Sequence, residues 1–313
     1  MLKRRHAGIL HLLTALTLLV AGCGSPLVRP SRFDWNPALE LRTAQLKEGT
    51  VLYAVAGDGP PIILLHGFGG QIWNWEKQIS PLSGRHRLYI PDLLGYGYSD
   101  RPAVDYTPEL FIESIRRLMD HVGLRTVSLI GNSMGGGIAW AFALTHPQRV
   151  EKLVLIDSMP PDVVPAVRNP SFRRLLAIRN VPILPYLAVG LHTRGMLRAT
   201  LKEMVFDDHL ITDPVVERQY RIGRIEGTPR VMTSTMRQVE AVKRYGAALS
   251  TLDKPTLIIW GDQDEVFPPA VGQELHATIR GSELLVIKES GHMPMWERPD
   301  ETNRAIVEFL GRE

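Results

Sequence analysis

The 313-residue sequence contains a single cysteine, Cys23, which excludes an internal disulfide. It also lacks a basic excess beyond its N-terminus. Three of its 36 Lys and Arg residues lie at positions 3–5, which leaves 33 against the 33 Asp and Glu residues. Because a nucleic-acid partner requires a basic surface that neutralises phosphates, this balance argues against one. The sequence shows neither a metal-ligand cluster nor a nucleotide-binding loop, so no cofactor is expected.

The first 22 residues contain no Asp or Glu and follow the order of residue types in a secretory signal. Lys3-Arg4-Arg5 precedes a mostly apolar run from Ala7 to Ala21, which is short of the ~20 residues that a membrane span needs. The motif Val20-Ala21-Gly22-Cys23 resembles the lipobox of bacterial lipoproteins. That resemblance implies cleavage before Cys23 and acylation of its side chain. An ordinary signal peptide and an uncleaved short anchor remain open as alternatives.

The lipobox resemblance implies an address and a partner. It predicts a lipid-anchored protein of the bacterial cell envelope, facing the periplasm. Gly24, rather than Asp, in second place favours the outer membrane. Two or three acyl chains on Cys23 would bind a membrane firmly, whereas one chain gives only marginal binding. Residues 23–40, which include three prolines, are then expected to form a tether.

From about residue 41 the sequence alternates between short apolar runs and amphipathic stretches. Ile62–Leu65, Val127–Ile130 and Thr256–Trp260 are continuous apolar runs, typical of strands buried on both faces. Between such runs, apolar residues recur at helical spacing, as from Phe111 to Val122. This order predicts an α/β fold with a mostly parallel sheet covered by helices on both faces.

The alternation is interrupted once, over residues 159–250. This stretch contains no comparable strand, and we interpret it as a helical cap inserted into a core formed by residues 41–158 and 251–313. It carries 14 Lys and Arg against 8 Asp and Glu, which fits anionic substrates, anionic lipid or a solvated surface. Its most apolar part, Val181–Leu191, is expected to wall a substrate pocket or to pack the cap on the core.

One motif predicts a catalytic nucleophile. Gly131-Asn132-Ser133-Met134-Gly135 follows a predicted strand and opens a predicted helix. In that context a G-x-S-x-G motif forms a sharp turn that presents the serine hydroxyl above the strand ends. Ser133 is therefore the candidate nucleophile, and the backbone N–H of Met134 is one candidate donor to an oxyanion. The second candidate donor is the N–H of Phe68, which follows an earlier strand between glycines.

A serine hydroxyl needs a base to remove its proton and an acid to orient that base. His292 follows the last predicted strand and is the candidate base, because its loop can return over the sheet. Asp264 follows the preceding strand and is the candidate acid. Asp262 and Asp157 also follow strands, and both remain alternatives for the acid.

Together these motifs resemble the α/β-hydrolase family over residues 50–310, essentially everything beyond the signal and the tether. The stretch Asp92–Asp100 is similar to the family's turn after the third core strand. Within the family, the sequence is most similar to esterases and lipases and to hydrolases that cleave carbon–carbon bonds in ring-cleavage products. The carbon–carbon hydrolases usually carry a tryptophan directly after the catalytic histidine, where this chain has Met293.

The resemblance implies hydrolysis through an acyl-Ser133 intermediate. We expect the substrate to be a carboxylic ester, a small molecule or a lipid, with a hydrophobic acyl group. An alternative is carbon–carbon bond hydrolysis of a vinylogous diketone, for which a cap arginine would bind the substrate carboxylate. Arg173, Arg174 and Arg194 are the candidates for that role. A third possibility is a catalytically inactive, membrane-tethered binding protein.

Overall fold

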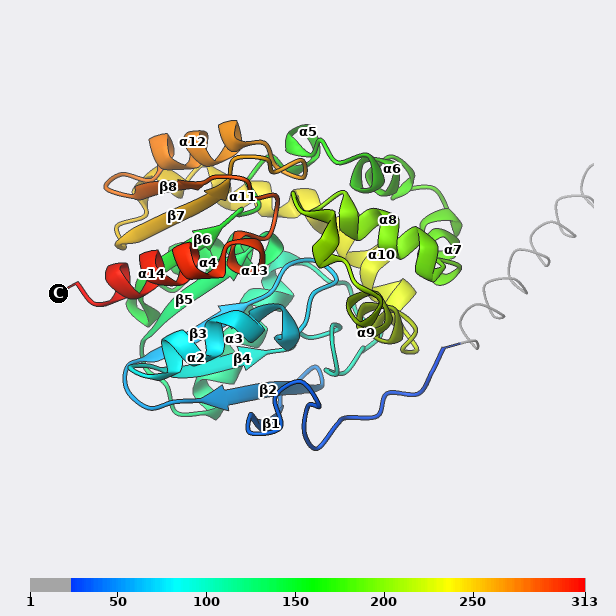
Figure 1. Ribbon diagram of the computed structural model, residues 1–313, viewed down its shortest axis with the longest axis horizontal. Coiled ribbons are helices and arrows are strands. Elements are labelled where there is room, and N and C mark those ends of the chain that lie inside the picture. The colour runs from blue at the N-terminus through cyan, green and yellow to red at the C-terminus, as the bar shows by residue number, and fades with distance from the viewer. Residues whose placement is uncertain (1–23, 313) are drawn as a thin grey trace, which may run out of the picture.

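The computed structural model describes residues 24–312, so the predicted signal peptide and the lipidation site Cys23 lie outside the described residues. One eight-stranded sheet with the order β1-β2-β4-β3-β5-β6-β7-β8 forms the centre of the molecule (Figure 1). β2 pairs with β1 and β4 antiparallel, and the other neighbours pair parallel. The strands are β1 (Glu40–Gln45), β2 (Thr50–Ala56), β3 (Pro61–Leu65), β4 (Arg87–Pro91), β5 (Val127–Asn132), β6 (Val150–Ile156), β7 (Thr256–Gly261) and β8 (Glu283–Ile287).

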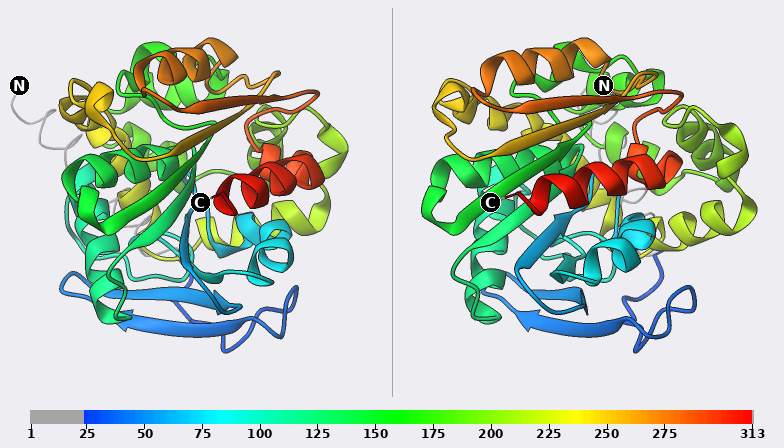
Figure 2. Two further views of the ribbon diagram at one scale, coloured as in Figure 1. Left: turned by 90° about the vertical axis from the view of Figure 1, so that its left-hand side faces the viewer. Right: turned by 60° about the vertical axis from the view of Figure 1, so that its left-hand side comes forward.

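Helices cover both faces of the sheet, as the alternating pattern predicts. On one face α3 (Pro108–His121), α4 (Met134–Thr145) and α12 (Pro269–Thr278) share an apolar cluster with the strands. On the other face α2 (Glu76–Ser83) packs beside α14 (Pro299–Leu310), and both views in Figure 2 show this pair. The short elements of the core are η1 (Ile72–Trp75), η2 (Pro147–Arg149) and α13 (Pro294–Glu297).

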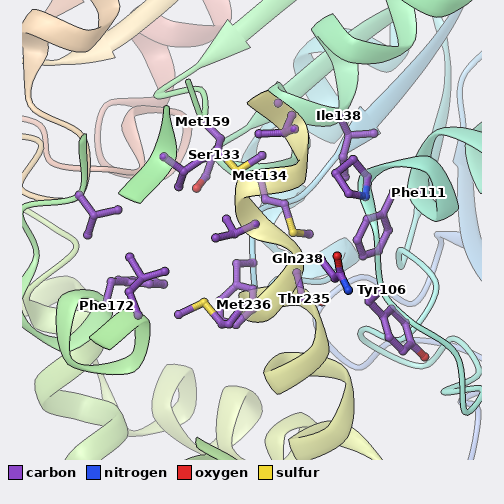
Figure 3. Close-up of a pocket in the computed structure, with 18 of the residues that line it drawn as sticks. Tyr106, Phe111, Ser133, Met134, Ile138, Met159, Phe172, Thr235, Met236 and Gln238 are labelled. Atoms are coloured by element: carbon purple, nitrogen blue, oxygen red, sulfur yellow. The ribbon is translucent and has the colours of Figure 1, made fainter. Parts of the chain in front are cut away.

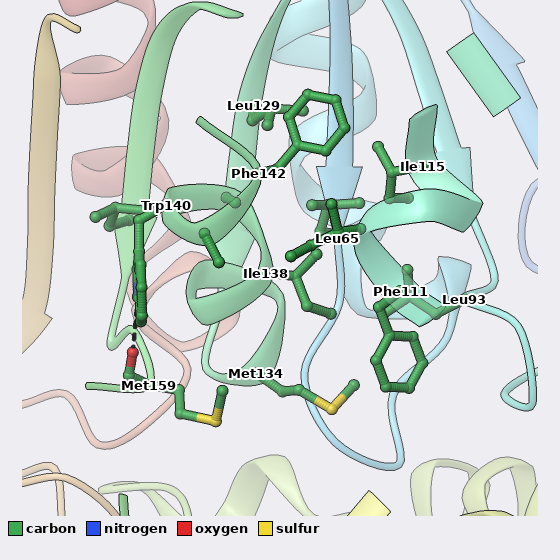
Figure 4. Packing of buried hydrophobic residues seen from close by; sticks show 14 of the residues in the cluster. Leu65, Leu93, Phe111, Ile115, Leu129, Met134, Ile138, Trp140, Phe142 and Met159 are labelled. Carbon is green, nitrogen blue, oxygen red and sulfur yellow. Dashed lines mark hydrogen bonds between the residues drawn. The ribbon is translucent and has the colours of Figure 1, made fainter. Parts of the chain in front are cut away.

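The helix that follows the predicted nucleophile is buried along most of its length. Every residue of α4 from Met134 to Ala143 is buried, because the helix packs against β5 and β6. Figure 4 shows Trp140 beside Met159, whose carbonyl accepts the indole N–H at 3.0 Å. Since burial on this scale leaves a helix few alternative positions, α4 fixes the turn that precedes it.

The residues between β6 and β7, 159–250, form helices and no strand, and we call them the cap. They lie over one end of the parallel strands (Figure 1). Among residues 24–312, no helix is long and apolar enough to span a membrane. The cap helices are α5 (Val163–Ala166), α6 (Pro170–Ile178), α7 (Leu184–Gly190), α8 (Arg194–Lys202), η3 (Asp208–Leu210), α9 (Asp213–Gly223), α10 (Thr228–Gln238), η4 (Val239–Val242), α11 (Lys243–Gly246) and η5 (Leu249–Thr251).

The stretch expected to be a tether contacts both the cap and the core. Ser25 forms a parallel bridge with Ile225 of the cap. Its N–H donates to the Arg224 carbonyl (2.8 Å), and its carbonyl accepts the Glu226 N–H (2.9 Å). Further along, Phe33 is buried in one of the two apolar clusters of the core. Residues 24–39 therefore form no helix or extended strand and lie along the surface of the folded protein.

Candidate active site

Ser133 lies at the turn between β5 and α4 with φ 53° and ψ −120°, a backbone conformation that strains a residue with a Cβ. The flanking glycines make the turn possible. A Cβ on Gly131 would lie 2.3 Å from the Gly135 carbonyl oxygen, and one on Gly135 would lie 2.0 Å from the Leu65 carbonyl oxygen. The Ser133 N–H donates to the Ile156 carbonyl at 3.0 Å. The motif thus forms the sharp strand-to-helix turn that the sequence predicts.

His292 and Asp264 form a hydrogen-bonded pair, with His292 Nδ1 2.8 Å from Asp264 Oδ2. Both are buried, His292 being 1% and Asp264 3% exposed. The other carboxylate oxygen of Asp264 accepts the N–H groups of Val266 (2.7 Å) and Phe267 (3.1 Å). These bonds satisfy the buried carboxylate and fix its orientation toward the imidazole.

Ser133 and His292 line the same cavity, so the structure brings the predicted nucleophile and base together. Asn132, the residue before the nucleophile, also reaches the base, because its Nδ2 donates to the His292 carbonyl at 3.2 Å. Of the two alternative acids, Asp262 lies beside Lys288, with 3.4 Å between the carboxylate oxygen and the ammonium nitrogen. No ion pair joins Asp262 to His292 among the described residues.

The other alternative acid, Asp157, lies directly behind the pair. One oxygen atom from it, one from Asp264 and one ring nitrogen of His292 lie within 4.8 Å of one another. These are the described residues that could converge on a metal ion, but the Nδ1–Oδ2 hydrogen bond already uses two of the three atoms. Asp157 Oδ1 accepts the Gly261 N–H at 2.9 Å, while Oδ2 has no partner among the described residues. Burial first, and the Asp264 carboxylate second, raise the pKa of Asp157 well above its ordinary value.

This proximity could have been found from the sequence. Asp157 follows β6 and Asp264 follows β7, and β6 and β7 are parallel neighbours. Since parallel neighbours end at the same edge of a sheet, the two carboxyl groups are expected to meet there. Burial favours the neutral, protonated form of Asp157, a form that exerts no charge repulsion on the Asp264 carboxylate.

Glu297 is a buried carboxylate that the sequence analysis missed. Its Oε1 accepts the N–H groups of Gly291 (2.9 Å) and Met293 (3.2 Å), the two neighbours of His292. Its Oε2 accepts the N–H of Phe206 in the cap at 2.7 Å. Burial raises the pKa of Glu297, and the three N–H groups partly offset that effect. Glu297 therefore fixes the loop of the base and joins that loop to the cap.

The two predicted oxyanion donors lie near the serine. Met134 is the first residue of α4, where the N–H has no partner inside the helix. The loop that contains Phe68 approaches from β3, and a Cβ on Gly67 would lie 3.0 Å from the Ser133 Cβ. Phe68, Ser133 and Met134 line the same apolar cavity. The role of the two N–H groups as donors to an oxyanion stays a prediction.

Two buried titratable groups support that loop. His66 Nε2 accepts the Leu93 N–H at 3.0 Å, and burial lowers the pKa of His66 to about 4, so its ring is neutral. Asp92 accepts the N–H groups of Ile72 and Tyr98, both at 2.7 Å. Burial raises the pKa of Asp92 to about 7. The stretch Asp92–Asp100 thus stabilises a turn, and neither cavity at Ser133 includes a residue from it.

Two cavities meet at Ser133. The first, which we call the apolar cavity, lies between α4 and the cap helices α6 and α10 (Figure 3). The second, which we call the His292 cavity, lies between the loop of Phe68, the loop of His292 and other cap residues. The apolar cavity includes Phe111, Ile138, Met159, Phe172, Leu176, Thr235, Met236 and Val239. The His292 cavity includes Trp73, Asn74, Asn132, Leu201, Met204, Gln219, Met293 and Trp296.

The described residues that line these two cavities include no Lys, Arg, Asp or Glu. Arg173 and Arg174 are exposed on α6, and Arg194 pairs with Glu217 at 2.7 Å. None of the three arginines predicted for a substrate carboxylate reaches either cavity. The apolar stretch Val181–Leu191 lines neither cavity, so α6 and α10 wall the site in its place.

The chain belongs to the α/β-hydrolase family, since residues 60–299 match the family model described as alpha/beta hydrolase fold. A curated relative is the 2-hydroxy-6-oxononadienedioate/2-hydroxy-6-oxononatrienedioate hydrolase of Paraburkholderia xenovorans, with 30% identity over 85% of this chain and 93% of the relative. An uncharacterised protein of Mycobacterium tuberculosis is 30% identical over 90% of this chain and 84% of its own length. Among solved structures, a meta-cleavage product hydrolase from Pseudomonas fluorescens superimposes with a TM-score of 0.74 at 27% identity. That match covers 86% of this chain and 97% of the other.

Proposed function

We propose that the protein is a serine hydrolase that cleaves carboxylic esters with a hydrophobic acyl group. The Ser133 hydroxyl attacks the ester carbonyl carbon while His292 takes the hydroxyl proton and Asp264 stabilises the imidazolium. The N–H groups of Phe68 and Met134 donate to the oxyanion of the tetrahedral intermediate. The intermediate then collapses, His292 gives the proton to the leaving alcohol, and the acyl group stays on Ser133. Water, activated by His292, releases the acid and restores the serine.

The two cavities indicate how the substrate is oriented at Ser133. The leaving alcohol must lie near the group that protonates it, and His292 lines only one of the two cavities at Ser133. The alcohol therefore occupies the His292 cavity. The acyl group occupies the apolar cavity, whose side chains exclude water from it.

The absence of charge in both linings, among the described residues, is the observation that carries the ester proposal. A neutral ester loses little when it leaves water, whereas an unpaired carboxylate loses a large hydration free energy. The curated name of the Paraburkholderia relative denotes a substrate with two carboxylates. Among the described residues, no Lys or Arg lines either cavity to pair with such a substrate.

The comparisons favour a second candidate, hydrolysis of a carbon–carbon bond in a ring-cleavage product, more than they favour the ester. The same Ser133 mechanism would serve, with a carbon leaving group in place of the alcohol. One described cation has a suitable position. The Arg218 guanidinium lies 4.7 Å from the ring centroid of Trp73, a residue of the His292 cavity. It has no ion pair among the described residues and could turn toward a carboxylate.

The mechanism is tested with Ser133→Ala in the full chain, with hydrolysis of p-nitrophenyl esters as the measurement. We expect turnover to fall by about 10⁴-fold or more, with an unchanged circular dichroism spectrum. A fluorophosphonate probe should label the parent and not the variant. A folded parent that neither hydrolyses the esters nor is labelled by the probe would instead match the catalytically inactive binding protein.

A substrate panel separates the two candidates. The parent and Arg218→Gln are assayed on p-nitrophenyl esters of increasing acyl length and on a 2-hydroxy-6-oxo-dienedioate. The ester proposal predicts a higher kcat/KM for the longer esters and no effect of Arg218→Gln on them. A preference for the dienedioate, together with a raised KM for it in Arg218→Gln, would overturn the ester proposal in favour of the carbon–carbon one.

A further inference from the structure

Exposed apolar side chains gather on one part of the cap. Among the described residues seven large apolar side chains are exposed, and five of them lie between residues 181 and 206. Leu191 is 61% and Met196 56% exposed, whereas the leucines and methionines of the core are buried. Because a soluble surface seldom groups such side chains without a reason, this concentration indicates an interaction surface.

The helix α7 forms the centre of this surface. From Val181 to Leu191 the sequence contains no charged residue. Pro185 and Val189 are buried against the cap, whereas Leu184 is 44% exposed. Leu184 is the first residue of α7 and Leu191 caps its C-terminal end, so the two are about two helical turns apart and lie on the same side of the helix. A helix that is apolar on its outer side as well as its inner side is expected to have a partner outside.

The N-terminal end of the described chain lies beside the same helix. Gly24, Tyr186 and Gly190 line one small cavity, and the last two belong to α7. The hydrogen bonds of Ser25 with the loop after α9 fix this position. Figure 1 shows the described chain beginning beside the cap. Residues 1–23, with their apolar run and lipobox-like motif, therefore join the folded protein next to α7.

The charge around α7 favours one kind of partner. Arg173 and Arg174 on α6, which packs against α7, are exposed and form no ion pair among the described residues. The cap as a whole carries 14 Lys and Arg against 8 Asp and Glu. An anionic lipid surface attracts basic side chains, each by about 1 kcal/mol when it lies near the surface.

We propose that the α7 face, defined as Val181, Leu184, Leu191 and Met196, inserts into the surface of an anionic lipid bilayer. The occupant is the membrane to which residues 1–23 would attach the chain, because that attachment point lies beside the same helix. Residues 1–23 would anchor the chain, and the α7 face would orient it so that the cap rests on the lipid. This proposal goes beyond the proposed function, since it does not depend on which bond Ser133 cleaves.

The test uses the full chain with single cysteines introduced by Leu184→Cys and Leu191→Cys. The matched control is Val104→Cys, an exposed apolar position outside the cap at 39% exposure. Each variant carries a polarity-sensitive thiol fluorophore, and the labelled parent supplies the background from Cys23. On addition of phosphatidylglycerol vesicles we expect a blue shift of emission at positions 184 and 191 and none at position 104. Vesicles of phosphatidylcholine alone should give a smaller shift.

Two results would overturn the proposal. One is the same emission at all three positions with vesicles present. The other is a blue shift at 184 and 191 that needs no lipid and grows with protein concentration, which would identify a second copy of the chain as the occupant.

A functional measurement separates this inference from the proposed function. We expect the double variant Leu184→Asp and Leu191→Asp to hydrolyse a soluble ester like the parent, because neither residue lines a cavity at Ser133. Hydrolysis of an ester dissolved in phosphatidylglycerol vesicles should fall by about tenfold or more, because two apolar contacts are lost. Val104→Asp should leave both rates unchanged. A parent that is inactive on the soluble ester would contradict the proposed function. The fluorescence test of the α7 face would still apply, because it does not depend on activity.

Discussion

The core and the cap of this protein bury opposite kinds of groups. At the strand ends of the core, charged and polar side chains are buried and paired, as with Asp264 at 3% and His292 at 1% exposure. In the cap, apolar side chains face outward, as with Leu191 at 61% exposure. Burying a charge is unfavourable unless its partners are fixed, and exposing apolar surface is unfavourable without a partner. Each departure supports one of our proposals: catalysis at the strand ends of the core, and contact with a partner at the cap.

The largest expected effect is a loss of chemistry that does not depend on the substrate. Asp264→Asn should lower kcat for every ester by about 10⁴-fold, because the amide cannot fix the tautomer and charge of His292. Asp157→Asn is the matched control and should stay close to the parent, since burial favours the neutral form of Asp157 and the amide is neutral as well. Steady-state kinetics on short and long esters measure both. If Asp157→Asn loses as much activity as Asp264→Asn, the two aspartates act as one acid and our assignment to Asp264 is wrong.

A smaller effect is expected at the junction of the two regions. Glu297→Gln replaces one of the two accepting oxygens with an NH₂ group, which leaves either the Phe206 N–H or the N–H groups of Gly291 and Met293 without an acceptor and should lower the free energy of unfolding by about 1–3 kcal/mol. Because Glu297 also orients the neighbours of His292, kcat should fall while KM changes little. Urea unfolding and steady-state kinetics are the measurements. The control is Glu289→Gln, which removes one partner of an exposed ion pair with Arg298 and should change neither the free energy of unfolding nor kcat. An unchanged kcat in a destabilised Glu297→Gln would restrict this residue to a structural role.

The cap should affect specificity alone. Met236→Trp on α10 places a larger side chain in the apolar cavity and should lower kcat/KM for long-chain esters by about tenfold or more, with acetate esters little affected. Met196→Trp, on the exposed side of the cap, is the control. The ratio of kcat/KM for octanoate and acetate esters measures the effect. An equal loss on both esters would mean that the acyl group does not occupy this cavity.

The last effect leaves activity aside and concerns stability and pH. The folded protein keeps a proton on Asp157 that the unfolded chain loses above its ordinary pKa of 3.8. Rising pH therefore lowers the free energy of unfolding between that value and the raised pKa of the folded state. Asp157→Asn removes this dependence, so it should gain stability over the parent as pH rises, by at most about 1.4 kcal/mol per pH unit. Urea unfolding from about pH 5 to about pH 8 measures the difference. A constant difference between the two proteins would contradict a neutral Asp157.

The sequence predicted the core better than the cap, for a physical reason. A strand buried on both faces must be apolar, and a turn such as that of Ser133 requires glycine, so both leave a readable pattern. β1 left none, because an edge strand that is exposed at most of its positions is built mainly from polar residues, here ELRTAQ. Glu297 was missed because its partners are backbone N–H groups, which carry no residue identity.

The cap could not be predicted at the same level. An apolar stretch such as Val181–Leu191 looks the same whether it lines a cavity, packs inward or faces a membrane. Its position depends on how short helices pack against one another, which no local pattern specifies. The family resemblance does not resolve this either, since both candidate reactions use the same Ser133, His292 and Asp264.

The bridge between Ser25 and Ile225 has a mechanical consequence. Any pull on the chain at Gly24 acts first on two hydrogen bonds, those of Ser25 with Arg224 and Glu226, before it reaches β1. Both bonds are made by the backbone of the same residue, Ser25, so tension at Gly24 would load them together. A protein held by its N-terminus would thus transmit tension into the cap that walls its substrate cavities, while the sheet that supports Ser133 stays unloaded.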